Sequence, residues 1–148
     1  MQRKLGIASK SGFSLMEIMI VIAIIGILFS IALPSYDGAV QRGRRSDAVQ
    51  TLLSLALKQE QYFAQQESYT TTIGNLPGVS SSNDSTQEFY SISVTAGRTG
   101  NIATSFKLLA TTKGVQSGDT DCATFTIDST NNKTALKSDS SSNTDKCW

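Results

Sequence analysis

The chain has 148 residues, 17% of them charged, and a formal net charge of +1. This length suffices for one ordinary domain, and so small a net charge gives no bulk electrostatic case for a protein that binds nucleic acid or anionic membranes. The sequence has no histidine and no nucleophile elbow, glycine-rich phosphate loop or carboxylate cluster, so we expect neither enzyme activity nor a cofactor.

Residues 1–12 are polar and basic, with Arg3, Lys4 and Lys10 and no acidic residue. The rest of the chain contains 10 basic and 12 acidic residues. Positive charge ahead of an apolar segment predicts a cytoplasmic N-terminus, with the rest of the chain on the other side of the membrane. Three arginines at positions 42, 44 and 45 reduce this asymmetry.

Residues 13–34 predict the hydrophobic half of a long helix. From Phe13 to Leu33 the only charged residue is Glu17, and a helix of about 21 residues is roughly 31 Å long, enough to cross a bilayer. A carboxylate in such a segment costs about 2.5–3.5 kcal/mol near the bilayer centre and less near the interface, so Glu17 is a candidate functional residue. Alternatively, its side chain reaches the interface beside a plain membrane anchor.

The run Lys10-Ser11-Gly12-Phe13-Ser14-Leu15-Met16-Glu17 resembles the class III signal of type IV prepilins. The resemblance implies that residues 1–12 are a leader and that a prepilin peptidase cuts between Gly12 and Phe13 and N-methylates Phe13. It also implies that Glu17 pairs in the filament with the α-amino group of Phe13 on an adjacent subunit. The alternative is a secretory signal cut after residues 30–32, which would release a soluble chain beginning near Leu33.

Residues 35–66 predict an amphipathic continuation of the helix. Pro34, an expected assembly residue together with Phe13 and Glu17, should kink or loosen the turn between the two halves. Apolar residues at three- and four-residue spacing indicate a face that packs on a core; they are Val49, Leu52, Leu53, Ala56 and Phe63, with Leu55 and Leu57 beside them. The residues expected on the opposite, solvated face are Arg42, Arg45, Lys58, Gln59 and Gln66.

Residues 67–87 are rich in Ser, Thr, Gly and Asn and predict a connecting loop, most mobile at residues 80–85. Beyond it, in residues 88–148, apolar and polar residues alternate. This pattern predicts strands at residues 90–95, 106–111 and 124–128, and a weak fourth strand at 134–137 that forms a hairpin with the third. The amphipathic helix would cover the apolar face of this antiparallel sheet, so residues 35–148 form one α+β head.

Cys122 and Cys147 are the only cysteines. In an exported chain they favour a disulfide, which closes a loop of about 25 residues and contributes roughly 3 kcal/mol in the chain-entropy model. The alternative, a metal site, needs more ligands than two thiols.

The whole pattern resembles the type IV pilin fold, in which a long N-terminal helix packs on a single antiparallel sheet of about four strands, followed by a disulfide-bounded loop. Residues 88–94, the strand at 106–112 and the ending Cys147-Trp148 look most like the minor pilins called PilE. The resemblance implies a structural subunit held as a single-pass protein in the inner membrane, with a periplasmic head. The inner-membrane pilus assembly machinery would join it to other pilin subunits in an extracellular pilus that serves twitching motility, adhesion or DNA uptake.

Two rival functions remain. Some minor pilins bind DNA directly, and Arg98, Lys107, Lys113, Lys133, Lys137 and Lys146 fall in the sheet or the C-terminal loop, interleaved with acids. The second rival is a type II secretion pseudopilin. Asp119, Asp121 and Asp128 would suit a calcium ion, as in some pseudopilins, although a solvated loop is the simpler interpretation, and we expect no metal.

Overall fold

The computed structural model describes residues 12–148, apart from the side chains of residues 33–35. It divides into two compact units, Met1–Gly38 and Ala39–Trp148. Helix α1 (Leu15–Gln66) contributes to both units. In the first unit, every side chain from residue 12 to residue 32 is exposed.

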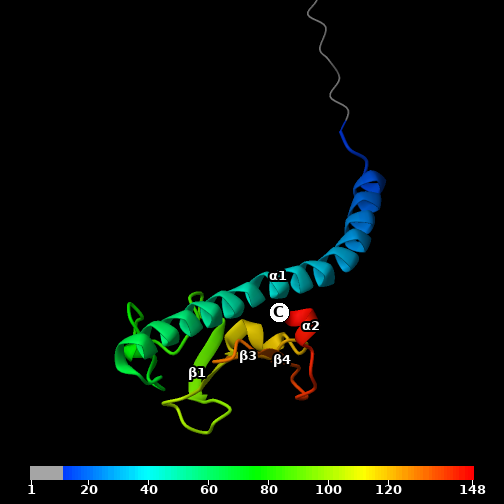
Figure 1. Cartoon of the computed structure of the whole chain (residues 1–148). Coiled ribbons are helices and arrows are strands. Elements are labelled where there is room, and N and C mark those ends of the chain that lie inside the picture. Colours follow the sequence, from blue (N-terminus) through cyan, green and yellow to red (C-terminus); the bar gives the residue numbers. More distant parts are fainter. Residues whose placement is uncertain (1–11) are drawn as a thin grey trace, which may run out of the picture. The chain divides into compact units, whose positions relative to one another are not determined.

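The second unit, hereafter the head, contains a four-stranded antiparallel sheet in the order β1-β2-β3-β4 (Figure 1). Its strands are β1 (Tyr90–Ala96), β2 (Phe106–Thr112), β3 (Thr124–Asp128) and β4 (Lys133–Leu136). Two short 3-10 helices, η1 (Ile73–Asn75) and η2 (Gly114–Gly118), lie in the connections, and helix α2 (Thr144–Cys147) follows β4. The long helix and antiparallel sheet confirm the predicted fold class.

The core lies between one face of the sheet and the part of α1 that belongs to the head (Figure 1). Tyr90, Phe106 and Phe125 are among its largest fully buried side chains, and Leu52 of α1 is buried with them. In β1, buried and exposed residues alternate, as strand geometry requires when one sheet face is covered. The outer face carries mainly serine and threonine.

The predicted faces of the amphipathic helix are partly wrong. Leu57 is 62% exposed, whereas Arg45 and Gln59, which we expect in solvent, are buried. Gln59 is covered because the chain returns along the helix, where the Gln59 Nε2 donates to the Thr70 carbonyl oxygen at 2.7 Å and the Thr70 N–H donates to the Gln59 Oε1 at 3.2 Å. A polar side chain can be buried at this position because the backbone of the next segment satisfies it.

The segment after α1 is also more firmly attached than its composition suggests. Ile73 and Leu76 belong to the core. Ser85, in the stretch expected to be most mobile, is buried and donates to the Asp47 Oδ2 at 2.5 Å.

Candidate functional site

The start of α1 carries the residues assigned to processing and assembly. Gly12 and Phe13 precede the helix, and the Glu17 backbone N–H lies 3.1 Å from both the Oγ and the carbonyl oxygen of Ser14. Ser-x-x-Glu is a helix-capping pattern that sequence reasoning missed, and a carboxylate in the first turn interacts favourably with the helix dipole. Glu17 is therefore also expected to stabilise the first turn of α1. The side chain of Pro34, the other assembly prediction, lies outside the described residues.

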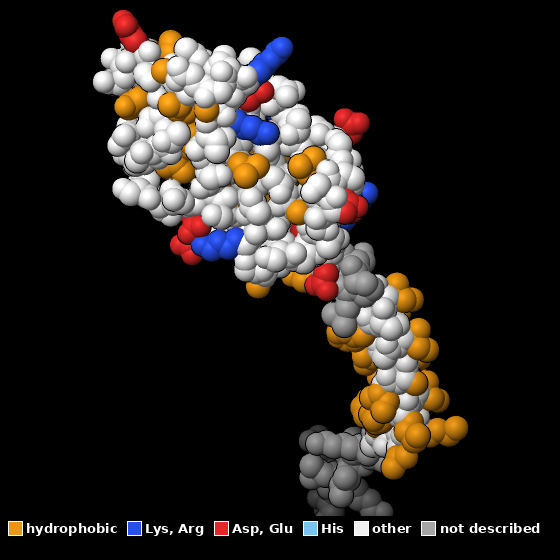
Figure 2. Space-filling model, turned by 90° about the horizontal axis from the view of Figure 1, so that it is seen from below, with side chains coloured by type: hydrophobic (Ala, Val, Ile, Leu, Met, Phe, Trp, Pro, Cys, Tyr) orange, Lys and Arg blue, Asp and Glu red, His pale blue; other side chains and the backbone are white. Residues whose placement is uncertain are grey.

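The surface of α1 in the first unit is almost wholly apolar (Figure 2). Within residues 12–148, α1 alone is long and apolar enough to cross a membrane. Its exposed large hydrophobic side chains between residues 15 and 31 are Leu15, Met16, Ile18, Met19, Ile20, Val21, Ile22, Ile24, Ile25, Ile27, Leu28, Phe29 and Ile31. A surface of this kind needs lipid or protein to cover it.

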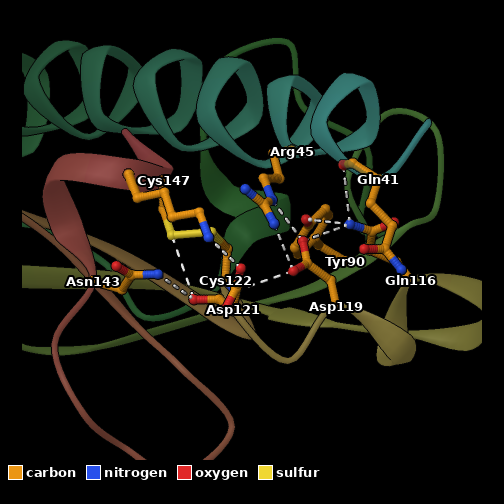
Figure 3. Close-up of polar contacts among 10 residues, drawn as sticks. Gln41, Arg45, Tyr90, Gln116, Asp119, Asp121, Cys122, Asn143 and Cys147 are labelled. Atoms are coloured by element: carbon orange, nitrogen blue, oxygen red, sulfur yellow. Dashed lines mark hydrogen bonds and ion pairs between the residues drawn. A yellow bond between two sulfur atoms is a disulfide. The ribbon is translucent and has the colours of Figure 1, made fainter. Parts of the chain in front are cut away.

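A buried ion pair joins α1 to the connection between β2 and β3 (Figure 3). The Arg45 Nε donates to the Asp119 Oδ2 at 2.6 Å and the Arg45 Nη2 donates to the Asp119 Oδ1 at 2.8 Å. The hydrogen bond to the Asp119 carboxylate raises the pKa of Arg45. Asp119 is only 1% exposed, so the expectation of a solvated loop is wrong at this residue.

The ion pair belongs to a larger polar network (Figure 3). The Gln116 Nε2 donates to the Asp119 Oδ2 at 3.1 Å, the Tyr90 hydroxyl at 3.2 Å and the Gln41 carbonyl oxygen at 3.3 Å. Burial raises the pKa of Tyr90 to about 12, even though the hydrogen bond from Gln116 acts in the opposite direction. Among the described side chains, the Gln116 Oε1 is buried without a hydrogen-bond partner. The network attaches the end of the β2–β3 connection to the first turns of α1 in the head.

The disulfide lies beside this network (Figure 3). Cys122 and Cys147 are bonded, with 5.8 Å between their Cα atoms, which confirms the predicted pair. The Cys122 N–H donates to the Asp119 Oδ1 at 3.2 Å, and the Asn143 Nδ2 donates to the Asp121 carbonyl oxygen at 3.0 Å. The C-terminal segment is therefore held by a covalent bond and by hydrogen bonds.

The three acids that would suit calcium are used elsewhere. Asp119 pairs with Arg45, and Asp121 accepts from the Lys146 Nζ at 2.5 Å. The Asp128 Oδ1 accepts from the backbone N–H groups of Thr130 and Asn132 in the β3–β4 turn. Within residues 12–148, no group of three His, Cys, Asp or Glu residues is placed to hold a metal ion.

The basic residues of the head differ in their partners. Lys113 pairs with Asp84 at 2.7 Å, and Lys146 with Asp121. Lys133 lies 5.2 Å from the Trp148 ring centroid and Arg44 lies 4.8 Å from that of Phe89, while the Lys58 Nζ donates to the Pro77 carbonyl oxygen. Four head cations have no salt bridge, cation–π contact or side-chain hydrogen bond to a described residue: Arg42, Arg98, Lys107 and Lys137.

Arg98 and Lys107 line the same hollow on the sheet, a cavity of about 330 Å³ that we call the Arg98 groove. Its lining residues are Ala96, Gly97, Arg98, Lys107, Thr126, Asp128, Asn132 and Thr134. Figure 2 looks at the outer face of the sheet, where uncharged groups predominate and charged side chains are scattered.

The loop that carries Arg98 is tightly hydrogen-bonded. The Gly97 N–H donates to the Ser105 carbonyl oxygen at 2.9 Å, and the Thr99 N–H donates to the Ser105 Oγ at 3.1 Å. A Cβ atom at Gly97 would lie 2.6 Å from the Phe106 carbonyl oxygen, so this position requires glycine. These hydrogen bonds constrain the backbone on both sides of Arg98.

A second cavity of about 360 Å³, which we call the Trp148 groove, lies between α1 and the C-terminal segment. Its lining residues are Arg42, Arg45, Ser46, Val49, Gln50, Lys146, Cys147 and Trp148. It brings together one cation without an ion-pair partner among the described residues, Arg42, and the only tryptophan of the chain.

Comparison with known proteins agrees with this architecture. Residues 7–33 match the family described as the prokaryotic N-terminal methylation motif, and residues 34–126 match the family described as "Type IV minor pilin ComP, DNA uptake sequence receptor". The fold, the apolar helix and the methylation motif define a type IV pilin, which is a structural and not an enzymatic protein. The chain belongs to the type IV minor pilin ComP family.

Individual relatives are similar over shorter stretches. The chain is 36% identical over 89 residues to the type IV major fimbrial protein FimA of Dichelobacter nodosus, covering 53% of this chain and 55% of FimA. It is 41% identical over 59 residues to the type IV major pilin PilA of Myxococcus xanthus, covering 40% of this chain and 27% of PilA. The chain thus spans about a quarter to a half of the length of these curated relatives.

A solved type IV pilin from Shewanella oneidensis is 25% identical, with a TM-score of 0.45, covering 63% of this chain and 89% of that one. The two family matches confirm the type IV pilin resemblance. Within the family, the matched description names ComP, whereas the PilE1 protein of Neisseria gonorrhoeae is named a major pilin and is 50% identical over 40 residues, 27% of this chain and 24% of PilE1.

Proposed function

We propose that this chain is a minor subunit of a type IV pilus that binds DNA during uptake. The family description carries the proposal, because it names a DNA uptake sequence receptor and matches residues 34–126, which include Arg98 and Lys107. The rival function of the sequence analysis is therefore better supported than a role in motility or adhesion alone.

The charge of the head restricts how DNA can bind. Residues 39–148 contain 10 basic and 10 acidic residues, so attraction to phosphate depends on local groups of cations and not on net charge. The Arg98 groove provides such a group, since Arg98 and Lys107 line it together and neither forms a salt bridge with a described acid, although Asp128 lines the same groove.

These two cations suit different tasks. Lysine neutralises a phosphate as a compact charge, whereas an arginine guanidinium also fits the O6 and N7 acceptors of guanine in the major groove. The hydrogen-bonded loop holds the backbone of Arg98 in place before DNA arrives, which lowers the entropic cost of binding. Of the two, Arg98 is therefore the better suited to confer sequence preference, because its planar donors have a fixed geometry.

The test measures the binding of the processed full-length protein, in detergent, to a fluorescent DNA duplex at several salt concentrations. Each phosphate contact contributes about −0.9 to the slope of log K against log[salt] for duplex DNA. Arg98→Gln/Lys107→Gln should therefore make the slope less negative by up to about 1.8. Lys137→Gln, a cation outside the groove, is the matched control. Wild-type protein that shows no salt-dependent DNA binding would contradict the proposed function.

The N-terminal half supplies the means of assembly in this proposal. The leader is removed between Gly12 and Phe13, and the apolar part of α1 rests in the inner membrane until subunits stack. Because lipid and the filament core are both apolar, transfer between them costs far less than exposure to water, which costs about 25 cal/mol per Å². Glu17 pairs with the methylated amine of Phe13 on a neighbouring subunit, since an unpaired buried carboxylate would be unfavourable.

A further inference from the structure

The Trp148 groove combines an apolar wall with cations. Val49, Cys147 and the Trp148 indole supply the apolar surface, while Arg42 and Lys146 supply positive charge. None of these residues is needed by the Arg98 groove, which has a separate set of lining residues.

The Trp148 ring is fixed in orientation. Its Nε1 donates to the Thr134 carbonyl oxygen at 2.8 Å, and its ring meets the Phe125 ring edge-on with 6.0 Å between centroids. Lys133 lies 5.2 Å from the ring centroid. The ring is only partly buried and lines the groove. An aromatic surface that is already held in place loses little freedom when a flat ligand stacks on it.

Two of the three cations that line the groove are available to an anion. Arg42 is exposed and forms no ion pair with a described residue. Lys146 pairs with Asp121, but these side chains are 59% and 43% exposed, so water and salt screen the pair and an anion can replace Asp121. Arg45, by contrast, is committed to Asp119.

We propose that the Trp148 groove binds one unpaired nucleotide of a DNA strand, with its base on Trp148 and its phosphate at Arg42 and Lys146. This inference rests on the proposed function. It adds a second DNA site on the head, separate from the Arg98 groove, that binds single-stranded DNA. Single-stranded nucleic acid is bound in this manner elsewhere, by aromatic rings that stack on bases beside cations that contact the backbone.

The size and shape of the groove favour an unpaired nucleotide over a duplex. A cavity of about 360 Å³ lies at the lower end of the range for small-molecule sites. A base inside a duplex has both faces covered by its neighbours and cannot stack on Trp148, whereas a strand end or a separated strand offers a free face.

Trp148 also provides the measurement, because it is the only tryptophan of the chain. The processed full-length protein in detergent is titrated with a short oligothymidylate and, separately, with a blunt duplex. We expect the single strand to quench Trp148 emission more strongly than the duplex does. Arg42→Gln should weaken single-strand affinity several-fold and make its salt slope less negative by about 0.7, and Lys137→Gln should change neither.

A second variant tests stacking directly. Trp148→Leu, measured by anisotropy of a labelled single strand, should weaken affinity by roughly 5- to 150-fold, with the urea unfolding midpoint recorded as a check on folding. Single strands that bind without quenching, with an affinity that Arg42→Gln leaves unchanged, would overturn the groove while the DNA-receptor function stands. If neither single strands nor duplexes bind, the proposed function itself fails.

Discussion

The buried ion pair between Arg45 and Asp119 should be the largest single polar contribution to the stability of the head. Asp119→Ala removes both hydrogen bonds of the Arg45 guanidinium and leaves it buried. It also removes an acceptor from the Gln116 Nε2 and from the Cys122 N–H. Breaking a buried pair by removing one partner costs about 3–5 kcal/mol.

The assay is urea unfolding followed by Trp148 fluorescence, which reports on the head alone. With a urea m-value of about 2 kcal/mol/M for a small domain, this loss lowers the unfolding midpoint by roughly 2 M. Asp121→Ala, which breaks only the exposed pair with Lys146, is the matched control and should leave the midpoint unchanged.

A double-mutant cycle separates the net contribution of the ion pair from the cost of leaving a single charge buried without its partner. Arg45→Met/Asp119→Leu should recover much of the loss, because apolar replacement of a whole buried pair is often neutral. A midpoint in Asp119→Ala within about 0.3 M of the wild type, less than one-fifth of the expected shift, would refute the assignment of a buried, energetically coupled pair.

The remaining predictions concern alkaline pH, the disulfide and the N-terminus. The pKa of Tyr90 is raised to about 12, whereas a tyrosine in the unfolded chain has a pKa of about 10, so the unfolded chain loses the proton first. The free energy of unfolding should therefore fall as the pH rises from about 10 towards 12. It should fall less steeply in Tyr90→Phe. Cys122→Ala/Cys147→Ala should lower the free energy of unfolding by up to about 3 kcal/mol, and a reductant should lower the wild-type urea midpoint but leave that of the variant unchanged. Glu17→Ala should be inserted and processed, since Ser14 still caps α1, but should be depleted from sheared pili; normal incorporation would count against the pairing with Phe13. Gly12→Ser should block leader removal, and mass spectrometry that finds a mature N-terminus at Phe13 in this variant would show otherwise.

Periodicity made the elements of the fold predictable. The third strand has the expected bounds, the first and second each end one residue later, and the fourth is shifted by one residue towards the N-terminus. Alternation of apolar and polar residues is a local property, so the strands can be recognised without their neighbours. The spacing of the two cysteines and the redox state of the compartment likewise sufficed for the disulfide.

The polar interior could not be predicted in the same way. Arg45 and Asp119 are separated by 74 positions, and Gln59 is satisfied by backbone groups of a segment with no regular pattern. Polar residues are assigned to the solvent-exposed face unless their partners are known. Sequence periodicity therefore assigned Arg45 and Gln59 to the wrong face of the helix. The grooves depend equally on distant segments, because Arg42 and Trp148 stand at opposite ends of the head sequence.

The most direct test of a DNA-binding pilus subunit is the retention of a labelled duplex by pili sheared from cells. We expect pili that contain the wild-type chain to retain DNA, and pili with Arg98→Gln/Lys107→Gln to retain less although equal amounts of subunit are present. Equal retention by pili from a strain that lacks this chain would contradict the account.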